Sequence, residues 1–172
     1  LLPDQVLPEI TAPADISLEA TGPTTPLTNS AIATFLGGAS ATDNIDVYDD
    51  DDITTDAPSA GFAVGTTSVI FTIVDSSGNS ATATANVTIV DTTGPIVSAP
   101  AAITVAATDA SGTAATDTTI ASYLISGTAL DLVNGEVAVT TNAPTILPLG
   151  TTTVTFSASD SQANGGSATS TV

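Results

Sequence analysis

The stretch that decides the fold is Ser68-Val-Ile-Phe-Thr-Ile-Val74, followed closely by Ala81-Thr-Ala-Thr-Ala-Asn-Val-Thr-Ile-Val90. Both runs are rich in Val, Ile, Phe and Thr, residue types that favour extended strands. The turn residues Ser76-Ser-Gly-Asn79 separate them, so the sequence predicts a β-hairpin. In the second run the apolar residues at odd positions from Ala83 to Ile89 alternate with polar ones, which is typical of a sheet with one buried face and one wet face.

This pattern occurs twice in the chain. Gly65-Thr-Thr-Ser-Val-Ile-Phe71 aligns with Gly150-Thr-Thr-Thr-Val-Thr-Phe156, and Asp75-Ser-Ser-Gly-Asn79 aligns with Asp160-Ser-Gln-Ala-Asn164, both at an offset of 85 residues. Helical periodicity is weak throughout; the best candidate is Ser30–Leu36, for which a short turn is an equal alternative. Short strands, frequent turns and a unit of this length indicate two copies of a β-sandwich.

The start of each copy has a similar segment, because the residues from Asp4 to Pro13 align with those from Asp91 to Pro100. The sequence therefore predicts a first domain over residues 1–90 and a second over residues 91–172. The last strand of the second domain is expected to be cut short relative to Ala81–Val90. Either the chain continues, or a strand from another chain completes the edge.

The charge balance excludes many functions. The chain of 172 residues has 18 acidic residues and no Lys, Arg or His, and it also lacks Cys, Met and Trp. Nucleic acids and anionic membrane surfaces are therefore unsuitable partners, and no apolar run reaches the roughly 20 residues of a membrane span. Zinc, haem and iron–sulfur sites lack their usual ligands, and serine or cysteine hydrolases lack their general base. We therefore expect no enzyme, no nucleic-acid binding and no membrane insertion.

The remaining chemistry is that of carboxylates. If strands alternate in direction, every second loop returns to the end where the chain enters the domain, so acidic residues far apart in the sequence converge there. The first expected set is Asp4, Asp43, Asp46, Asp75 and Asn79. The second expected set is Asp91, Asp131, Asn134, Asp160 and Asn164.

These clustered carboxylates predict a cation site. With no Lys or Arg in the chain, no protein cation offsets their repulsion. Ca²⁺ accepts six to eight oxygen ligands in irregular geometry, whereas Mg²⁺ requires a nearly octahedral shell. The alternative is that these aspartates only cap turns of the backbone. The acidic run Tyr48–Asp52 is similarly open between a solvated loop and a further cation or partner site.

Several ordered motifs resemble one known family. They are Pro8-Glu-Ile-Thr-Ala-Pro13, Ala41-Thr-Asp-Asn44, Val64-Gly-Thr-Thr-Ser-Val69, Asp75-Ser-Ser-Gly-Asn79 and the closing Asp91. In this order they resemble a hyalin repeat (HYR) domain. The second copy departs from the pattern at Leu132, in place of Asn, and at Ala163, in place of Gly.

The resemblance implies an all-β fold of two tandem immunoglobulin-like β-sandwich domains, in an extracellular or cell-surface protein associated with adhesion, with no enzymatic activity. We therefore expect a structural module, such as a stalk, spacer or fibre subunit, stiffened by calcium. Its expected partners are other copies of itself or neighbouring domains of a longer chain. One alternative is an adhesin domain that recognises a glycan or a protein. Another is a filament subunit that polymerises by donor-strand complementation, with Leu1–Leu7 as the donor.

Overall fold

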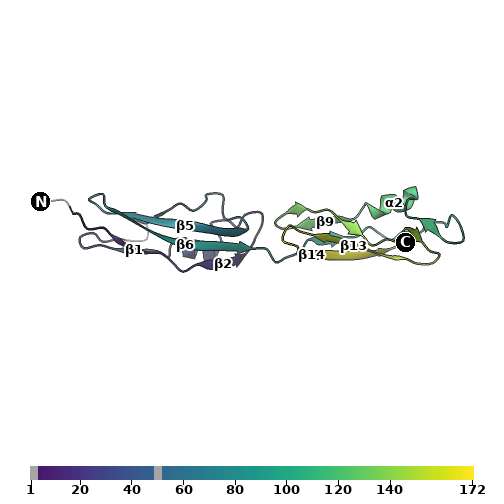
Figure 1. Cartoon of the computed structure of the whole chain (residues 1–172), viewed down its shortest axis with the longest axis horizontal. Coiled ribbons are helices and arrows are strands. Elements are labelled where there is room, and N and C mark those ends of the chain that lie inside the picture. The colour runs from purple at the N-terminus through teal and green to yellow at the C-terminus, as the bar shows by residue number, and fades with distance from the viewer. Residues whose placement is uncertain (1–3, 49–51) are drawn as a thin grey trace. The chain divides into compact units, whose positions relative to one another are not determined.

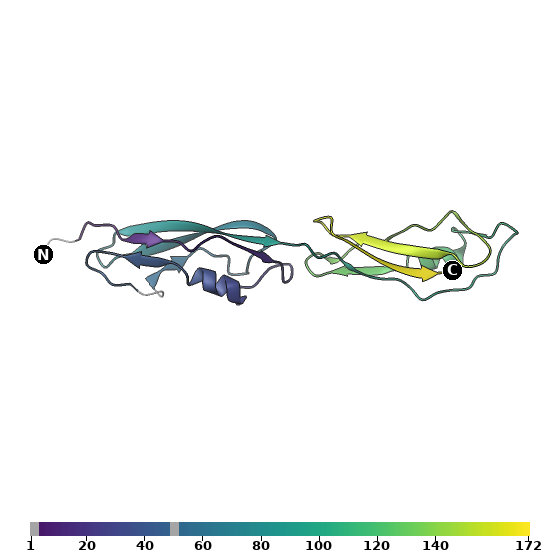
Figure 2. The same cartoon turned by 90° about the horizontal axis from the view of Figure 1, so that it is seen from below.

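The computed structural model describes residues 4–48 and 52–172, and it divides into two compact units, Leu1–Asp91 and Thr92–Val172. The division lies beside the boundary expected between residues 90 and 91. Strands dominate both units, as the ribbons in Figures 1 and 2 show. The all-β sandwich prediction is thus confirmed.

The first unit contains a four-stranded sheet of order β2-β6-β5-β4 and a two-stranded sheet of β1 and β3. Its elements are β1 (Glu9–Thr11), β2 (Ile16–Glu19), α1 (Ser30–Leu36), β3 (Ser40–Thr42), β4 (Thr54–Thr55), β5 (Gly65–Val74) and β6 (Ser80–Val90). Strand β1 contacts both β5 and β6, so the small sheet packs on the larger one.

The predicted hairpin is confirmed as β5 and β6. The two strands pair in antiparallel register from Gly65 opposite Ile89 to Val74 opposite Ser80. The predicted alternation is also present, because Val87 and Ile89 are buried while their polar neighbours are partly exposed. This buried face forms the core of the first unit.

Strand direction does not alternate throughout the sandwich, contrary to the expectation from sequence. Strand β2 pairs with β6 in parallel, with Ile16 opposite Val87 and Glu19 opposite Val90. The chain enters in β1, which belongs to the small sheet, and crosses at Pro13 into the large sheet without reversing. Proline has no backbone N–H for pairing, so β1 ends before it.

Each unit also contains one short helix, α1 and α2 (Thr118–Leu124), of seven residues. The Asn29 side chain accepts hydrogen bonds from the first turn of α1, and that of Asp117 does the same for α2. The open choice between helix and turn at Ser30–Leu36 is therefore resolved as a helix. Within the described ranges, neither helix has the length and hydropathy needed to cross a bilayer.

The second unit also consists mainly of strands, but they form three small sheets rather than two. Its sheets have the orders β10-β9-β7, β11-β13-β14 and β12-β8. The strands are β7 (Ile96–Ser98), β8 (Thr113–Ala114), β9 (Thr128–Asp131), β10 (Gly135–Glu136), β11 (Thr140–Thr141), β12 (Ile146–Leu147), β13 (Thr153–Ser159) and β14 (Gly165–Thr171). Tyr123 of α2 packs edge-on against Phe156 of β13 with ring centroids 5.7 Å apart, as Phe35 packs against Phe71 in the first unit.

Candidate metal centre

Three carboxylates of the first unit converge at one end of the sandwich. Asp4 precedes β1, Asp43 directly follows β3 and Asp75 directly follows β5. Because β1 and β3 are antiparallel, the beginning of one strand lies beside the end of the other. One carboxylate oxygen of each of the three residues lies within 4.8 Å of the other two.

The turn that follows β3 fixes Asp43. Its Oδ1 accepts hydrogen bonds from the backbone N–H of Ile45 at 3.0 Å and of Asp46 at 3.3 Å. The Oδ1 of Asp4 similarly accepts from the backbone N–H of Val6 at 3.0 Å. Each of these local bonds leaves the second carboxylate oxygen outside the turn, so capping and cation binding are compatible at the same residue.

Asp75 is the most buried of the three, at 5% exposure. Its Oδ1 accepts from the backbone N–H of Ser77 at 2.9 Å and of Asn79 at 2.7 Å, and its Oδ2 accepts from Asn79 Nδ2 at 2.6 Å. Burial opposes ionisation of this carboxyl, but the hydrogen bonds from Asn79, Ser77 and Gly78 outweigh it and lower its pKa. Asp75 is therefore a carboxylate at neutral pH.

Two other members of the expected set hold the loops together. The Oδ2 of Asp46 accepts hydrogen bonds from the backbone N–H of Ser76 at 3.1 Å and from its Oγ at 3.0 Å. Asn79 donates through Nδ2 to the backbone carbonyl of Asp4 at 3.1 Å. Both residues therefore position the three converging carboxylates, whether or not they also bind a cation; their role as ligands stays a prediction.

Asn44 was not among the residues expected from the sequence, although it lies inside the motif that contains Asp43. With its amide nitrogen facing the cluster, Asn44 donates to Asp4 Oδ2 at 3.2 Å and to both Asp43 oxygens at 3.0 and 3.2 Å. With its amide oxygen facing the cluster, the same position adds a fourth oxygen to the three carboxylates. Asn44 could have been predicted from its position next to Asp43, because the side-chain carbonyl oxygen of Asn is a common calcium ligand.

Tyr48 lies at the border of this cluster. Its hydroxyl is buried and has no hydrogen-bond partner among the residues that the structure describes. Burial, followed by the negative charges of Asp43, Asp46, Asp75 and Asp52, raises the pKa of the phenol above its usual value. Of the expected acidic run Tyr48–Asp52, residues 49–51 lie outside the described residues.

The second unit carries a matching arrangement. Asp131 is the last residue of β9 and Asp160 directly follows β13, and a carboxylate oxygen of one lies within 4.8 Å of one of the other. Asp131 Oδ1 accepts from the backbone N–H of Val133 and Asn134, both at 2.8 Å. This repeats the turn that Asp43 forms in the first unit.

The hairpin turn of the second unit also follows the first. Asp160 Oδ1 accepts from the backbone N–H of Gln162 at 2.9 Å and of Asn164 at 2.8 Å, and Asn164 Nδ2 donates to Asp160 Oδ2 at 2.7 Å. Burial again opposes ionisation, and the hydrogen bonds from Asn164 and Gln162 again lower the pKa of the carboxyl.

Asn134 takes the role of Asp46 in the second unit, because its Oδ1 accepts from Ser161 N–H at 3.2 Å and from Ser161 Oγ at 3.1 Å. Asp91 is the last residue of the first unit and is 7% exposed. Its expected part in the second set stays a prediction, as do the metal-ligand roles of Asn134 and Asn164.

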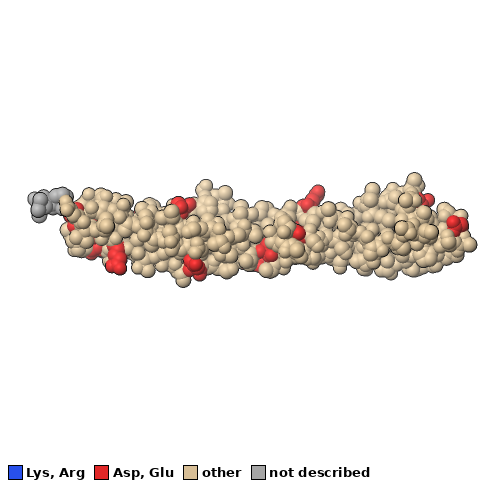
Figure 3. All heavy atoms as spheres, in the orientation of Figure 1, with Lys and Arg blue, Asp and Glu red and all other residues tan. Residues whose placement is uncertain are grey.

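The electrostatics of the first cluster favour a cation. Three carboxylates lie close together, and the surface view in Figure 3 shows acidic groups without any basic one, as the sequence requires. A hard dication that takes oxygen ligands relieves this repulsion, and calcium tolerates the irregular set of carboxylate and amide oxygens found here.

Comparison with protein families gives one match. The sequence model of the family described as HYR domain matches residues 3–89, which is about half of the chain and includes all three carboxylates of the first cluster. A comparison with curated proteins gives no match.

Proposed function

The chain belongs to the HYR domain family, whose members are non-catalytic immunoglobulin-like domains of extracellular and cell-surface proteins, and we propose that it is a structural module, stiffened by bound calcium, of such a protein. The observation that carries the proposal is the convergence of Asp4, Asp43 and Asp75 from three separate segments. An ion bound by all three would crosslink those segments.

The chain has few other means of crosslinking. It has no Cys for a disulfide and no Lys, Arg or His side chain for a salt bridge. Small domains commonly rely on such links or on a bound metal for part of their stability. An ion that binds the native state stabilises it by mass action, because the unfolded chain does not hold the ligands together.

The carboxylates proposed as calcium ligands are also oriented before a cation binds. Turn hydrogen bonds orient Asp43 and Asp75, and Asn79 connects the hairpin turn to Asp4. The entropy cost of gathering these groups is therefore met largely by folding, which leaves more of the binding free energy to stabilise the domain. This arrangement supports a structural role for the ion.

Thermal unfolding with and without calcium tests the proposal. We expect millimolar calcium to raise the melting temperature and a chelator to lower it, since extracellular calcium modules bind at about 10⁻⁴ to 10⁻³ M. Asp43→Asn and Asp75→Asn should each lose most of the calcium-dependent shift.

Asp56→Asn is the matched control. It removes the same charge, and the remaining oxygen can still accept the hydrogen bond from Ile70 N–H seen at 2.7 Å. It should keep the full calcium shift. Identical melting curves for the wild type in calcium and in chelator, with metal loss verified by elemental analysis, would contradict the proposal.

A further inference from the structure

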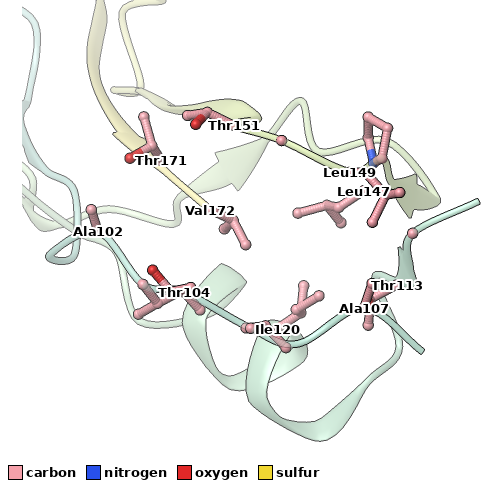
Figure 4. A pocket seen from close by; sticks show the side chains of 15 residues that line it. Ala102, Thr104, Ala107, Thr113, Ile120, Leu147, Leu149, Thr151, Thr171 and Val172 are labelled. Atoms are coloured by element: carbon pink, nitrogen blue, oxygen red, sulfur yellow. The ribbon is translucent and has the colours of Figure 1, made fainter. Parts of the chain in front are cut away.

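The reactive groups of the second unit lie at its turns rather than in its cavity. The cavity of about 460 Å³ is lined by uncharged residues such as Ile120, Leu147 and Leu149, and no described residue of its lining has an ionisable side chain (Figure 4). Two turns of the same unit each contain an asparagine followed directly by a glycine, Asn134 and Asn164. No other Asn of the chain precedes a glycine.

An Asn–Gly pair has a chemistry of its own. The backbone nitrogen of the residue after Asn can attack the side-chain amide carbon Cγ, and a glycine carries no Cβ that hinders this approach. Asn is for this reason a chemically labile residue. Whether the attack occurs in a folded protein depends on how freely the side chain can rotate towards the next nitrogen.

The turn between β9 and β10 leaves Asn134 accessible. Asn134 is exposed, and Gly135 after it has φ of +75°. A Cβ on Gly135 would meet nothing within 4 Å, so the nucleophilic nitrogen belongs to a residue in open space. The side chain of Asn134 can therefore turn towards Gly135 without displacing a neighbour.

The hydrogen bonds that hold the Asn134 side chain oppose this rotation only weakly. Its Nδ2 donates to Ser161 Oγ at 2.9 Å, and its Oδ1 accepts from Ser161 N–H at 3.2 Å. Both bonds join neutral groups at exposed positions. Water can replace them when the side chain rotates, so little free energy is lost.

Asn164 is held much more firmly. Its N–H donates to Asp160 Oδ1 at 2.8 Å and its Nδ2 donates to Asp160 Oδ2 at 2.7 Å, and both bonds are partly buried. Burial opposes ionisation of Asp160, but the hydrogen bonds outweigh it and lower the pKa, so the acceptor is a carboxylate. Hydrogen bonds to an ionised group are roughly twice as strong as neutral ones. Rotation of Asn164 towards Gly165 would break the bond from Nδ2.

The backbone at Gly165 is confined as well. Gly165 pairs with Ser159 at the start of β14. A Cβ on Gly94 would collide with the carbonyl of Gly165, and a Cβ on Gly166 would collide with the carbonyl of Pro95. The segment before β7 therefore packs directly on the beginning of β14 and leaves the Gly165 nitrogen little room to move.

We propose that Asn134 is a site of spontaneous deamidation in the folded protein, with the Gly135 nitrogen as the nucleophile, and that Asn164 is protected. The Gly135 nitrogen loses its proton to solvent and bonds to Cγ of Asn134. The bond from Cγ to Nδ2 breaks, and Nδ2 takes up a proton and leaves as ammonia. Water then opens the resulting succinimide ring, at the side-chain carbonyl to give aspartate or at the backbone carbonyl to give isoaspartate.

The first unit shows that an aspartate fits at position 134. Asp46 lies at the equivalent place, and its Oδ2 accepts from Ser76 N–H at 3.1 Å and Ser76 Oγ at 3.0 Å, as Asn134 Oδ1 accepts from Ser161. Deamidation thus gives the second unit a carboxylate that the first unit has in its sequence. The isoaspartate product lengthens the backbone next to Gly135 and should disturb its pairing with β9. This inference does not rest on calcium binding.

Incubation of the full chain at mildly alkaline pH and physiological temperature tests the proposal. Pepsin digestion and mass spectrometry then measure deamidation at each Asn, since the chain has no Lys or Arg for trypsin. We expect Asn134 to convert at least about tenfold faster than Asn164, because Asn164 must first break a partly buried hydrogen bond to a carboxylate. In concentrated urea the two sites should convert at similar rates, since the unfolded chain holds neither side chain.

Two variants separate the nucleophile from the protecting contact. Gly135→Ala should slow the conversion of Asn134 both in the folded protein and in urea, because the new Cβ hinders the attacking nitrogen. Asp160→Ala should raise the rate at Asn164 towards that at Asn134, and circular dichroism verifies that both variants are folded. The proposal is overturned if Asn134 stays intact in the folded protein while it converts in urea. Equal rates at Asn134 and Asn164 in the folded protein would overturn it as well.

Discussion

Asn79 donates a hydrogen bond from Nδ2 to the backbone carbonyl of Asp4 at 3.1 Å, across 75 positions of sequence. The same nitrogen donates to Asp75 Oδ2 at 2.6 Å. One amide therefore sets the separation between the segment before β1 and the hairpin turn after β5. These are two of the three segments that supply the carboxylate cluster.

Replacement of Asn79 by Ala should destabilise the first unit. The change removes two hydrogen bonds at partly buried atoms, for which we expect a loss of about 1 to 3 kcal/mol in the free energy of unfolding. Urea denaturation measures this loss. Asn86→Ala is the control, because it removes only the solvent-exposed hydrogen bond from Asn86 Nδ2 to Asp15 Oδ2 at 3.1 Å, which should contribute less. Equal losses in the two variants would contradict the linking role of Asn79.

Acid should destabilise the first unit through Asp75. Burial opposes ionisation of Asp75, but hydrogen bonds from Asn79, Ser77 and Gly78 outweigh it and hold its pKa below the ordinary value of 3.8. A depressed pKa in the folded state stabilises the protein at every pH above the unfolded-state pKa, and this contribution is lost as the pH falls through the folded-state pKa.

Urea denaturation from about pH 6 to about pH 2 in chelator measures this dependence. Asp75→Asn should flatten the acid limb of the stability curve, since the amide does not titrate in this range. The prediction is wrong if the variant loses stability with falling pH as steeply as the wild type does.

The fold was largely predictable from the sequence because its main signal is local. The alternation in β6 and the turn after Asp75 predict the hairpin without any distant contact. The parallel pairing of β2 with β6 was not predictable, since Ile16–Glu19 is short and its partner is fixed only by the crossing at Pro13. A repeat alignment shows equivalent positions but not the direction of their strands.

The sequence was enough to predict which loops meet at the candidate site. It was not enough to predict the role of each side chain there. Asp43 and Asp46 are the same residue type in the same loop, yet only Asp43 lies in the carboxylate cluster. Asp46 instead accepts a hydrogen bond from the backbone N–H of Ser76. Such differences arise from side-chain rotamers and turn geometry. Asn44 was missed for the same reason, since its contribution depends on the direction of its amide.

Two glycines with the same backbone angle should respond differently to substitution. Gly61 and Gly78 both have φ of +90°, which L residues rarely adopt. A Cβ on Gly61 would lie 2.5 Å from the carbonyl oxygen of the buried Thr25, whereas a Cβ on Gly78 meets nothing within 4 Å.

Gly78→Ala should therefore cost only the backbone strain, about 1 to 2 kcal/mol, and Gly61→Ala should cost about 1 to 3 kcal/mol more because of the clash. Urea denaturation of both variants measures the difference. If the two variants were equally stable, the loop that contains Gly61 would have to relax away from Thr25.

Calcium should lower the pKa of Tyr48. Burial raises the pKa of this phenol in the metal-free protein, and the carboxylates of Asp43, Asp46, Asp75 and Asp52 raise it further by disfavouring a phenolate beside them. A bound dication offsets the carboxylate charge, so that part of the shift should disappear. The part caused by burial should remain.

A spectroscopic titration of the phenolate in the near ultraviolet measures this pKa, because the chain has no Trp and only two Tyr residues. Subtracting the titration of Tyr48→Phe isolates the signal of Tyr48 from that of Tyr123. The raised pKa of Tyr48 contributes stability that is fully present below the unfolded-state pKa and is lost as the pH rises through the folded-state pKa, so stability should fall in alkaline solution. In calcium the Tyr48 titration should move to lower pH, and in Asp43→Asn this movement should be much smaller. A Tyr48 titration that calcium leaves unchanged would place the ion elsewhere and count against the cluster of Asp4, Asp43 and Asp75.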